Sequence, residues 1–290
     1  MKDTNIQWNP GFIAAMHLEL KDSQHELIFE KEHHLNASLF AADLLLIKKD
    51  PSAQIQNEIG AFFREHNIIE YNASGESLDA DAFYKCIAYA GLYKSYGNAP
   101  DERKADDITV SIIREALPRE LFKYLSRHGF SIINPAYGIY HIYGKILFPT
   151  QIIITKELNR RKHAWLKALS ANLTKDDIQN LLDNVQSLSD PSDLEIAGSV
   201  LESSFSANRQ IIQQLTGDDT MYEVLMQILE PQLVLRDQEK KEEGRLEGQR
   251  EGISKTVDLL REFGHDDPEI KAAVMRKYDL SEDEANLFFQ

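Results

Sequence analysis

Two carboxylates stand where the sequence could support metal-dependent chemistry. Asp43 lies near the start of the apolar run at residues 42–48, and Glu70 lies near the end of the short segment 67–72. A carboxylate is costly to bury unless it is paired or bound to a metal. Taken singly, each is better explained as a strand-end residue in water. Taken together on neighbouring strands, they could both reach one hard divalent cation such as Mg²⁺ or Mn²⁺.

Residue 72 decides what such a site could do. Side chains two apart in a strand share a face, so Asn72 is expected to point where Glu70 points. In metal-assisted hydrolysis of a phosphodiester, a lysine here would stabilise the attacking hydroxide and the charge developing on the phosphate. Asn72 can hydrogen-bond a water but carries no charge. It is either a surface amide at a strand end or the replacement of a catalytic lysine.

The elements that must position these residues follow from hydrophobic periodicity. Near-continuous apolar runs predict strands covered on both faces, and apolar residues at helical spacing predict the helices between them. The fold class is therefore α/β with a mixed sheet flanked by helices. The expected helices are 10–20, 57–65, 77–95 and 118–128, and the expected strands are 25–32, 42–48, 67–72, 107–114, 130–134, 139–143 and 148–155.

Composition shifts divide the chain. Residues 1–156 form the expected α/β core, and 157–235 read as a helical extension. Residues 236–252, which include EKKEEGRLEGQREG, form a charged linker with glycines four apart, and each interior glycine weakens a helix by about 1 kcal/mol. Residues 253–290 return to amphipathic helices and predict a small helical module.

Charge and composition limit the partners. The net charge is −15, so any contact with nucleic acid must rest on a local basic patch or on metal ions. Apolar runs are too short to span a bilayer, the N-terminus lacks the apolar core of a signal peptide, and Cys86 is the single cysteine. These features predict a cytoplasmic protein without a membrane partner.

No HExxH pattern or cysteine pair points to zinc.

Several longer stretches resemble one known family. The order of a helix, a strand with Asp, a strand with Glu-x-x and a further helix resembles the core of the PD-(D/E)XK nuclease fold. Within that fold the chain is similar to the bacterial recombination-promoting nuclease and transposase-like family. The stretches that carry the likeness are ADLLLIKK (42–49), NEIGAFFREHNIIEYNAS (57–74), DAFYKCIAYAGLYKS (81–95), LPRELF (117–122), FPTQIIIT (148–155) and the EG-repeat tail.

The resemblance implies roles for particular residues. Asp43 and Glu70 fall on the metal-binding acids of that fold, and the carbonyl of Tyr71 is a further ligand. Glu19, in the first helix, falls where the fold often places an additional acid, and a solvated helix residue is the alternative. Asn72 falls on the catalytic lysine.

A lysine elsewhere in the chain could take the role of the lysine that is missing at position 72. Lys85 lies on the helix after the motif, where some members of the wider fold carry the lysine, and the alternative is contact with solvent or phosphate. The run NRRKHAWLK at 159–167 could contact phosphates, but a solvated helical face is the favoured interpretation.

Two functions remain open from the sequence. The first is a Mg²⁺- or Mn²⁺-dependent DNA endonuclease whose activity is weakened or lost because Asn72 replaces the lysine. The second is a non-catalytic DNA-binding or assembly protein that retains the nuclease fold and forms homo-oligomers or binds partners through its C-terminal helices. The retained Asp43 and Glu70 favour the first, whereas Asn72 and the acidic charge favour the second.

Overall fold

The computed structural model describes residues 8–34, 41–73, 76–215 and 266–278, with positions 253, 257, 280–282 and 286. The chain divides into two compact units, Met1–Ile228 and Leu229–Gln290. The expected linker at 236–252 lies outside the described residues. Among those described, no helix combines the length and apolar character needed to cross a bilayer.

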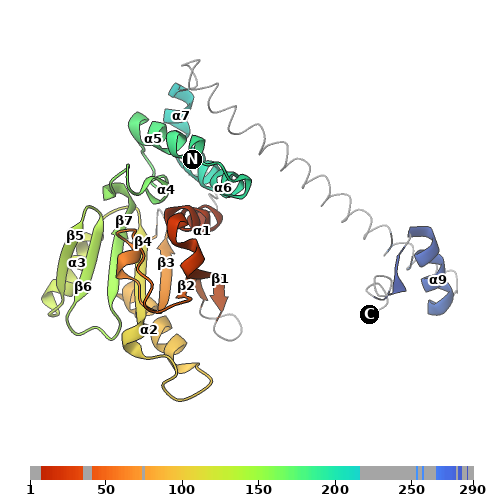
Figure 1. The fold of residues 1–290 in the computed structure, drawn as a ribbon, viewed down its shortest axis with the longest axis horizontal. Coiled ribbons are helices and arrows are strands. Elements are labelled where there is room, and N and C mark those ends of the chain that lie inside the picture. The colour runs from red at the N-terminus through yellow and green to blue at the C-terminus, as the bar shows by residue number, and fades with distance from the viewer. Residues whose placement is uncertain are drawn as a thin grey trace. The chain divides into compact units, whose positions relative to one another are not determined.

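A seven-stranded mixed sheet forms the centre of the first unit (Figure 1). The strand order is β1-β2-β3-β4-β7-β6-β5, in which β3, β4 and β7 run parallel and the remaining neighbours run antiparallel. The strands are β1 (Leu27–His34), β2 (Ala41–Lys48), β3 (His66–Asn72), β4 (Ile108–Arg114), β5 (Ser131–Ala136), β6 (Ile139–Tyr143) and β7 (Thr150–Ile154). The mixed α/β class predicted from the sequence is confirmed.

The helices of this unit pack beside the sheet or against one another. They are α1 (Trp8–Glu19), α2 (Ala80–Ser95), α3 (Arg119–Arg127), α4 (Ala164–Lys167), α5 (Lys175–Gln186), α6 (Pro191–Ala207) and α7 (Arg209–Leu215). Helices α4 to α7 belong to the same compact unit as the sheet, and α1 packs against both α4 and α6.

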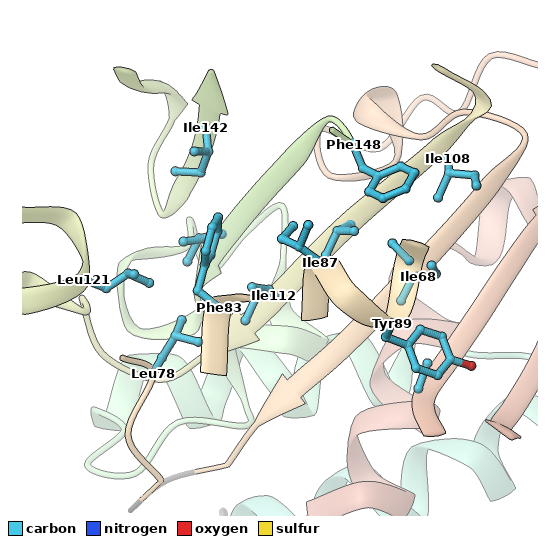
Figure 2. Close-up of a cluster of buried hydrophobic side chains, with 14 of the residues drawn as sticks. Ile68, Leu78, Phe83, Ile87, Tyr89, Ile108, Ile112, Leu121, Ile142 and Phe148 are labelled. Atoms are coloured by element: carbon cyan, nitrogen blue, oxygen red, sulfur yellow. The ribbon is translucent and has the colours of Figure 1, made fainter. Parts of the chain in front are cut away.

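One face of the sheet is covered by α2. Figure 2 shows Phe83 and Ile87 of this helix directed at the sheet residues Ile68 and Ile112. The helix begins at Ala80 because Asp79 caps it, accepting a hydrogen bond from the backbone N–H of Ala82 at 3.0 Å. This packing fixes α2 over the strand face that also carries the side chain of residue 70.

The opposite face is covered by α1. The ring of Phe12 stacks on Tyr71 of β3, with centroids 4.9 Å apart. The helix in turn lies close to α6, because Gly11 leaves no side chain between the two backbones. A Cβ on Gly11 would lie 2.2 Å from the Oγ of Ser203.

We expect Gly11→Ala to destabilise the first unit by about 1–3 kcal/mol, although alanine is the better helix former. The added methyl group would also lie 2.7 Å from the Cβ of Ser203, so the two helices must separate. Urea unfolding followed by circular dichroism measures the loss. Combining it with Ser203→Gly should restore most of the stability, and an additive loss in the double variant would contradict this account.

The helix expected at 57–65 is absent, and only the three-residue 3-10 turn Gly60–Phe62 is present. Side chains there compete with helical hydrogen bonds. The Oδ1 of Asn57 accepts from the N–H of Ile59, and the Oδ1 of Asn67 accepts from the N–H of Arg64. These amides hold the segment in an irregular conformation.

The second unit contains α9 (Asp267–Tyr278). Its residues Ile270 and Val274 are buried with Ile253 and Val257. This small apolar cluster holds the described part of the unit together.

Candidate functional site

Asp43 and Glu70 face each other across the β2–β3 pair. The paired register of β2 and β3 ends with Leu44 opposite Ile69, and Asp43 and Glu70 are the next residues of the two strands. A side-chain hydrogen bond joins the two carboxyl groups. The two acids therefore lie on adjacent strands, as their sequence context predicted.

Further donors orient the carboxylate of Asp43. The backbone N–H of Tyr71 donates to its Oδ2 at 2.7 Å, and the side-chain amide of Asn9 donates to its Oδ1 at 3.3 Å. Asn9 lies in the first turn of α1. The first helix therefore reaches the site through its N-terminal end.

The environment of Glu70 favours its neutral form. Burial raises the pKa of Glu70 to about 8, and the negative charge of Asp43 adds to the rise, while the positive charge of Lys85 opposes it. Two carboxyl groups this close cannot both ionise cheaply without a cation between them. At neutral pH the pair is expected to hold one proton.

This shift predicts a pH-dependent stability in the presence of a chelator. Because the pKa of Glu70 is raised from 4.5 to about 8 in the folded state, the native protein binds more protons than the unfolded chain between these values. The free energy of unfolding should therefore fall as pH rises from about 4.5 to 8, by up to about 1.4 kcal/mol per pH unit. Urea unfolding in EDTA across this range measures the slope.

The matched control for that measurement is Glu70→Gln, which keeps the shape and cannot ionise. The difference in free energy of unfolding between the wild type and this variant isolates the contribution of residue 70. A difference that stays constant from pH 5 to 8 would contradict the shifted titration.

A cavity of about 130 Å³ lies beside the carboxyl pair. Residues Glu70, Tyr71 and Asn72 of β3 line one side, and Lys85, Cys86 and Tyr89 of α2 line the other. Lys85 is exposed, and its positive charge acts on Glu70. Burial raises the pKa of Cys86 to about 12, so its thiol is not a nucleophile at neutral pH.

Asn72 lies on the same strand face as Glu70, two residues further along. Its Nδ2 donates to the Oε2 of Glu76 at 3.3 Å, while its Oδ1 is buried without a hydrogen-bond partner among the residues that the structure describes. In the parallel register with β4 it pairs with Arg114. Within the same described part of the chain, the Nε of Arg114 is likewise buried without a partner.

Glu19 lies away from the carboxyl pair. It ends α1, ten residues after Asn9, which corresponds to about 15 Å along a helix axis. Its Oε1 lies 2.6 Å from the Nδ1 of His163 and accepts a hydrogen bond from Asn57 at 2.9 Å. The structure therefore brings Asp43, Glu70, Tyr71 and Asn72 together and places Glu19 in a separate buried network.

His163 is the centre of that network, which contradicts the solvated helical face expected for 159–167. The side chain is only 1% exposed and lies between Glu19 and Glu58, with its Nε2 3.1 Å from the Oε2 of Glu58. Burial alone would lower the pKa of His163, but the hydrogen bonds and charges of the two glutamates outweigh it, so the pKa is raised. No local pattern in the sequence signals a contact to a glutamate so far away.

Asn9 is the other residue that sequence reasoning missed. Its position in the Asn9-Pro10 pair indicated only the start of a helix. The length of the helix could have identified Asn9 as a candidate. A 12-residue helix can place only one of its two ends beside a given strand end.

Asp43 and Glu70 supply two of the oxygen donors that a hard divalent cation would require. Within the described residues, no group of three histidine, cysteine, aspartate or glutamate side chains is arranged to hold a metal. The paired carboxyl groups of Asp43 and Glu70 therefore need neutral oxygens or water to complete a shell. The N–H of Tyr71 points toward Asp43, and because the N–H and C=O of one strand residue face the same neighbour, its carbonyl lies on that side too.

Comparison of the chain with protein-family models, with curated proteins and with solved structures finds no match.

Proposed function

We propose that this chain is a PD-(D/E)XK-type DNA endonuclease that depends on Mg²⁺ or Mn²⁺, with activity weakened or lost through Asn72. The observation that carries the proposal is the facing pair of Asp43 and Glu70 on β2 and β3, with Asn72 two residues further on the same face. The order α1, β2, β3, α2 around this pair supports the same fold.

Each residue has a defined task in this proposal. A bound Mg²⁺ or Mn²⁺ would activate a water molecule and neutralise charge on a phosphodiester. Asp43 and Glu70 would hold the ion, and the hydrogen bonds from Asn9 and Tyr71 fix how Asp43 presents its oxygens. Lys85 lines the same cavity, and its ammonium group would place a positive charge near the phosphate.

A cleavage assay tests the proposal. The full chain is incubated with supercoiled plasmid and with linear duplex DNA in Mg²⁺, in Mn²⁺ and in EDTA. Cleavage that requires the divalent cation and is lost in Asp43→Ala supports the proposal. The matched control is Glu195→Ala, which removes an exposed acid of α6 and should cleave as the wild type does.

The second candidate function is a non-catalytic DNA-binding or assembly protein with the same fold. It is favoured by the neutral side chain at residue 72 and by the net charge of −15. It predicts no cleavage by the wild type or by Asn72→Lys under any of these conditions, with equal binding of DNA or of a protein partner by both. Light scattering of the full chain would then report any homo-oligomer.

A further inference from the structure

Helix α3 carries a stripe of positive charge on a chain whose net charge is −15. Arg119, Lys123 and Arg127 are exposed and stand four residues apart, so they share one face of the helix along about 12 Å. The opposite face is apolar, and its Leu121 and Leu125 are buried. The packing of α3 on the sheet therefore leaves all three cations in solvent.

Helix α2 lies on the same side of the sheet, and the two helices meet through aromatic rings. Leu121 of α3 and Phe83 of α2 belong to one apolar cluster (Figure 2). The ring of Tyr84 contacts the ring of Tyr124 edge to face, with centroids 6.4 Å apart, and His128 stacks on Tyr124 at 4.0 Å. Tyr84 remains 43% exposed. An aromatic ridge therefore runs between α2 and α3, beside the positive stripe.

Basic residues outnumber acidic ones over this surface, which we call the α2–α3 face and define by residues 80–88, 119–129 and 144–145. The loop at 144–145 belongs to it because a Cβ on Gly144 would lie 2.9 Å from the carbonyl oxygen of Gly129, two residues beyond α3. A locally positive surface is what an acidic protein needs to contact phosphates. The exposed charged residues of the face are five cations and two acids, namely Lys85, Arg119, Lys123, Arg127 and Lys145 with Asp81 and Glu120.

We propose that the α2–α3 face binds single-stranded DNA, with phosphates on its cations and an unpaired base stacked on the ring of Tyr84. The cations supply the sequence-independent attraction for a phosphate backbone. An aromatic ring exposed to solvent offers a surface on which an unpaired base can stack, whereas the bases of a duplex are already stacked on one another. Charge and exposed aromatic surface together favour a single strand over a duplex.

Lys85 connects the α2–α3 face to the cavity beside the carboxyl pair. It is exposed on α2 next to Tyr84, and it lines the same cavity as Glu70. A strand that crosses α2 from the stripe of α3 would therefore reach that cavity. The identity of this strand as the substrate rests on the proposed function, whereas its binding requires neither the cation nor cleavage.

Strand binding by the full chain is measured in EDTA, where metal-dependent cleavage cannot occur. The probe is a fluorescein-labelled oligodeoxythymidine, alone and as its duplex with oligodeoxyadenosine, and fluorescence anisotropy gives the affinity at several salt concentrations. The single strand should bind more tightly than the duplex. The triple variant Arg119→Gln, Lys123→Gln, Arg127→Gln should make the plot of log affinity against log salt shallower by about 2, since each phosphate contact of a single strand contributes about 0.7.

Two variants at residue 84 test the stacking. Tyr84→Ala should weaken binding of the single strand by about 5-fold or more, because it removes the stacking surface. Tyr84→Phe keeps the ring and should bind as the wild type does.

The matched control for the charge is the triple variant Arg160→Gln, Arg161→Gln, Lys162→Gln. It makes the same change in net charge outside the α2–α3 face and should leave the salt dependence unchanged. Circular dichroism confirms that each variant is folded.

Three results would overturn the inference: binding of the duplex as tight as that of the single strand, wild-type affinity in Tyr84→Ala, or an equal change of slope in the two triple variants. Tighter binding of oligoglutamate than of the strand would assign the face to an acidic protein segment and would overturn it too.

Failure of the proposed function is distinguishable from these results. If the strand binds as expected but is not cut in Mg²⁺ or Mn²⁺, the α2–α3 face stands and the nuclease does not. If the wild type cuts DNA and no variant of the face alters binding, the nuclease stands and the face does not.

Discussion

Asn72→Lys should raise the rate of DNA cleavage at saturating Mg²⁺ by about 10²–10³-fold, since one preorganised electrostatic contact to the developing charge is worth about 2.7–4 kcal/mol. The substitution places a cation on the strand face of Glu70, in the cavity that borders the carboxyl pair. Initial rates on plasmid DNA measure the effect. Because the lysine also repels the ion, half-maximal activity should require more Mg²⁺ than in the wild type.

The gain should disappear when Asp43→Ala or Glu70→Ala is added to the variant, because a lysine without the metal has no activated water to assist. Lys85 provides the decisive comparison, since it lines the same cavity from α2. Strong cleavage by the wild type that is unchanged in Asn72→Lys and abolished in Lys85→Ala would show that α2 already supplies the cation. In that case Asn72 would not be what limits activity.

His163→Ala should lower the free energy of unfolding of the first unit by about 3–5 kcal/mol, because it leaves the buried Glu19 without its charged partner. The two side chains are each 1% exposed and lie 2.6 Å apart. Urea unfolding at pH 6 measures the loss. The replacement of both partners, Glu19→Met with His163→Leu, should recover most of it, because no uncompensated charge then remains buried.

The pH dependence gives this prediction a second measurement. Because the pKa of His163 is raised in the folded state, its stabilising effect is fully present below the ordinary value of 6.5 and is lost as pH rises through the folded-state value. The matched control is Lys162→Ala, which removes an exposed partner of Glu58 and should cost less than about 1 kcal/mol. Equal losses in the two variants would contradict the buried pair.

Local elements of the α/β core follow closely from the sequence. The apolar run at 42–48 and the segment 67–72 match β2 and β3 within one residue at each end. The apolar stripe of α2 predicted from the sequence consists of Phe83, Cys86, Ile87, Ala90 and Leu92. Phe83, Ile87 and Ala90 are buried as expected, Cys86 and Leu92 are partly buried, and the helix also buries Tyr89 and Tyr93, which were not in the stripe. Patterns of this kind depend on neighbours within a few residues, so the sequence alone contains them. The predicted helix at 57–65 was wrong because asparagine side chains there replace the helical hydrogen bonds.

The sequence by itself determined that Asp43 and Glu70 stand at strand ends and that residue 72 lacks a positive charge. Only the tertiary structure decided which residues meet. The pairing of β2 with β3 brings Asp43 and Glu70 within hydrogen-bonding distance, and the direction of α1 brings Asn9 to Asp43 and Glu19 to His163. The physical reason is that register and helix direction are fixed by the packing of whole elements. A contact between residues as distant in the chain as Glu19 and His163 leaves no periodic signal in the sequence.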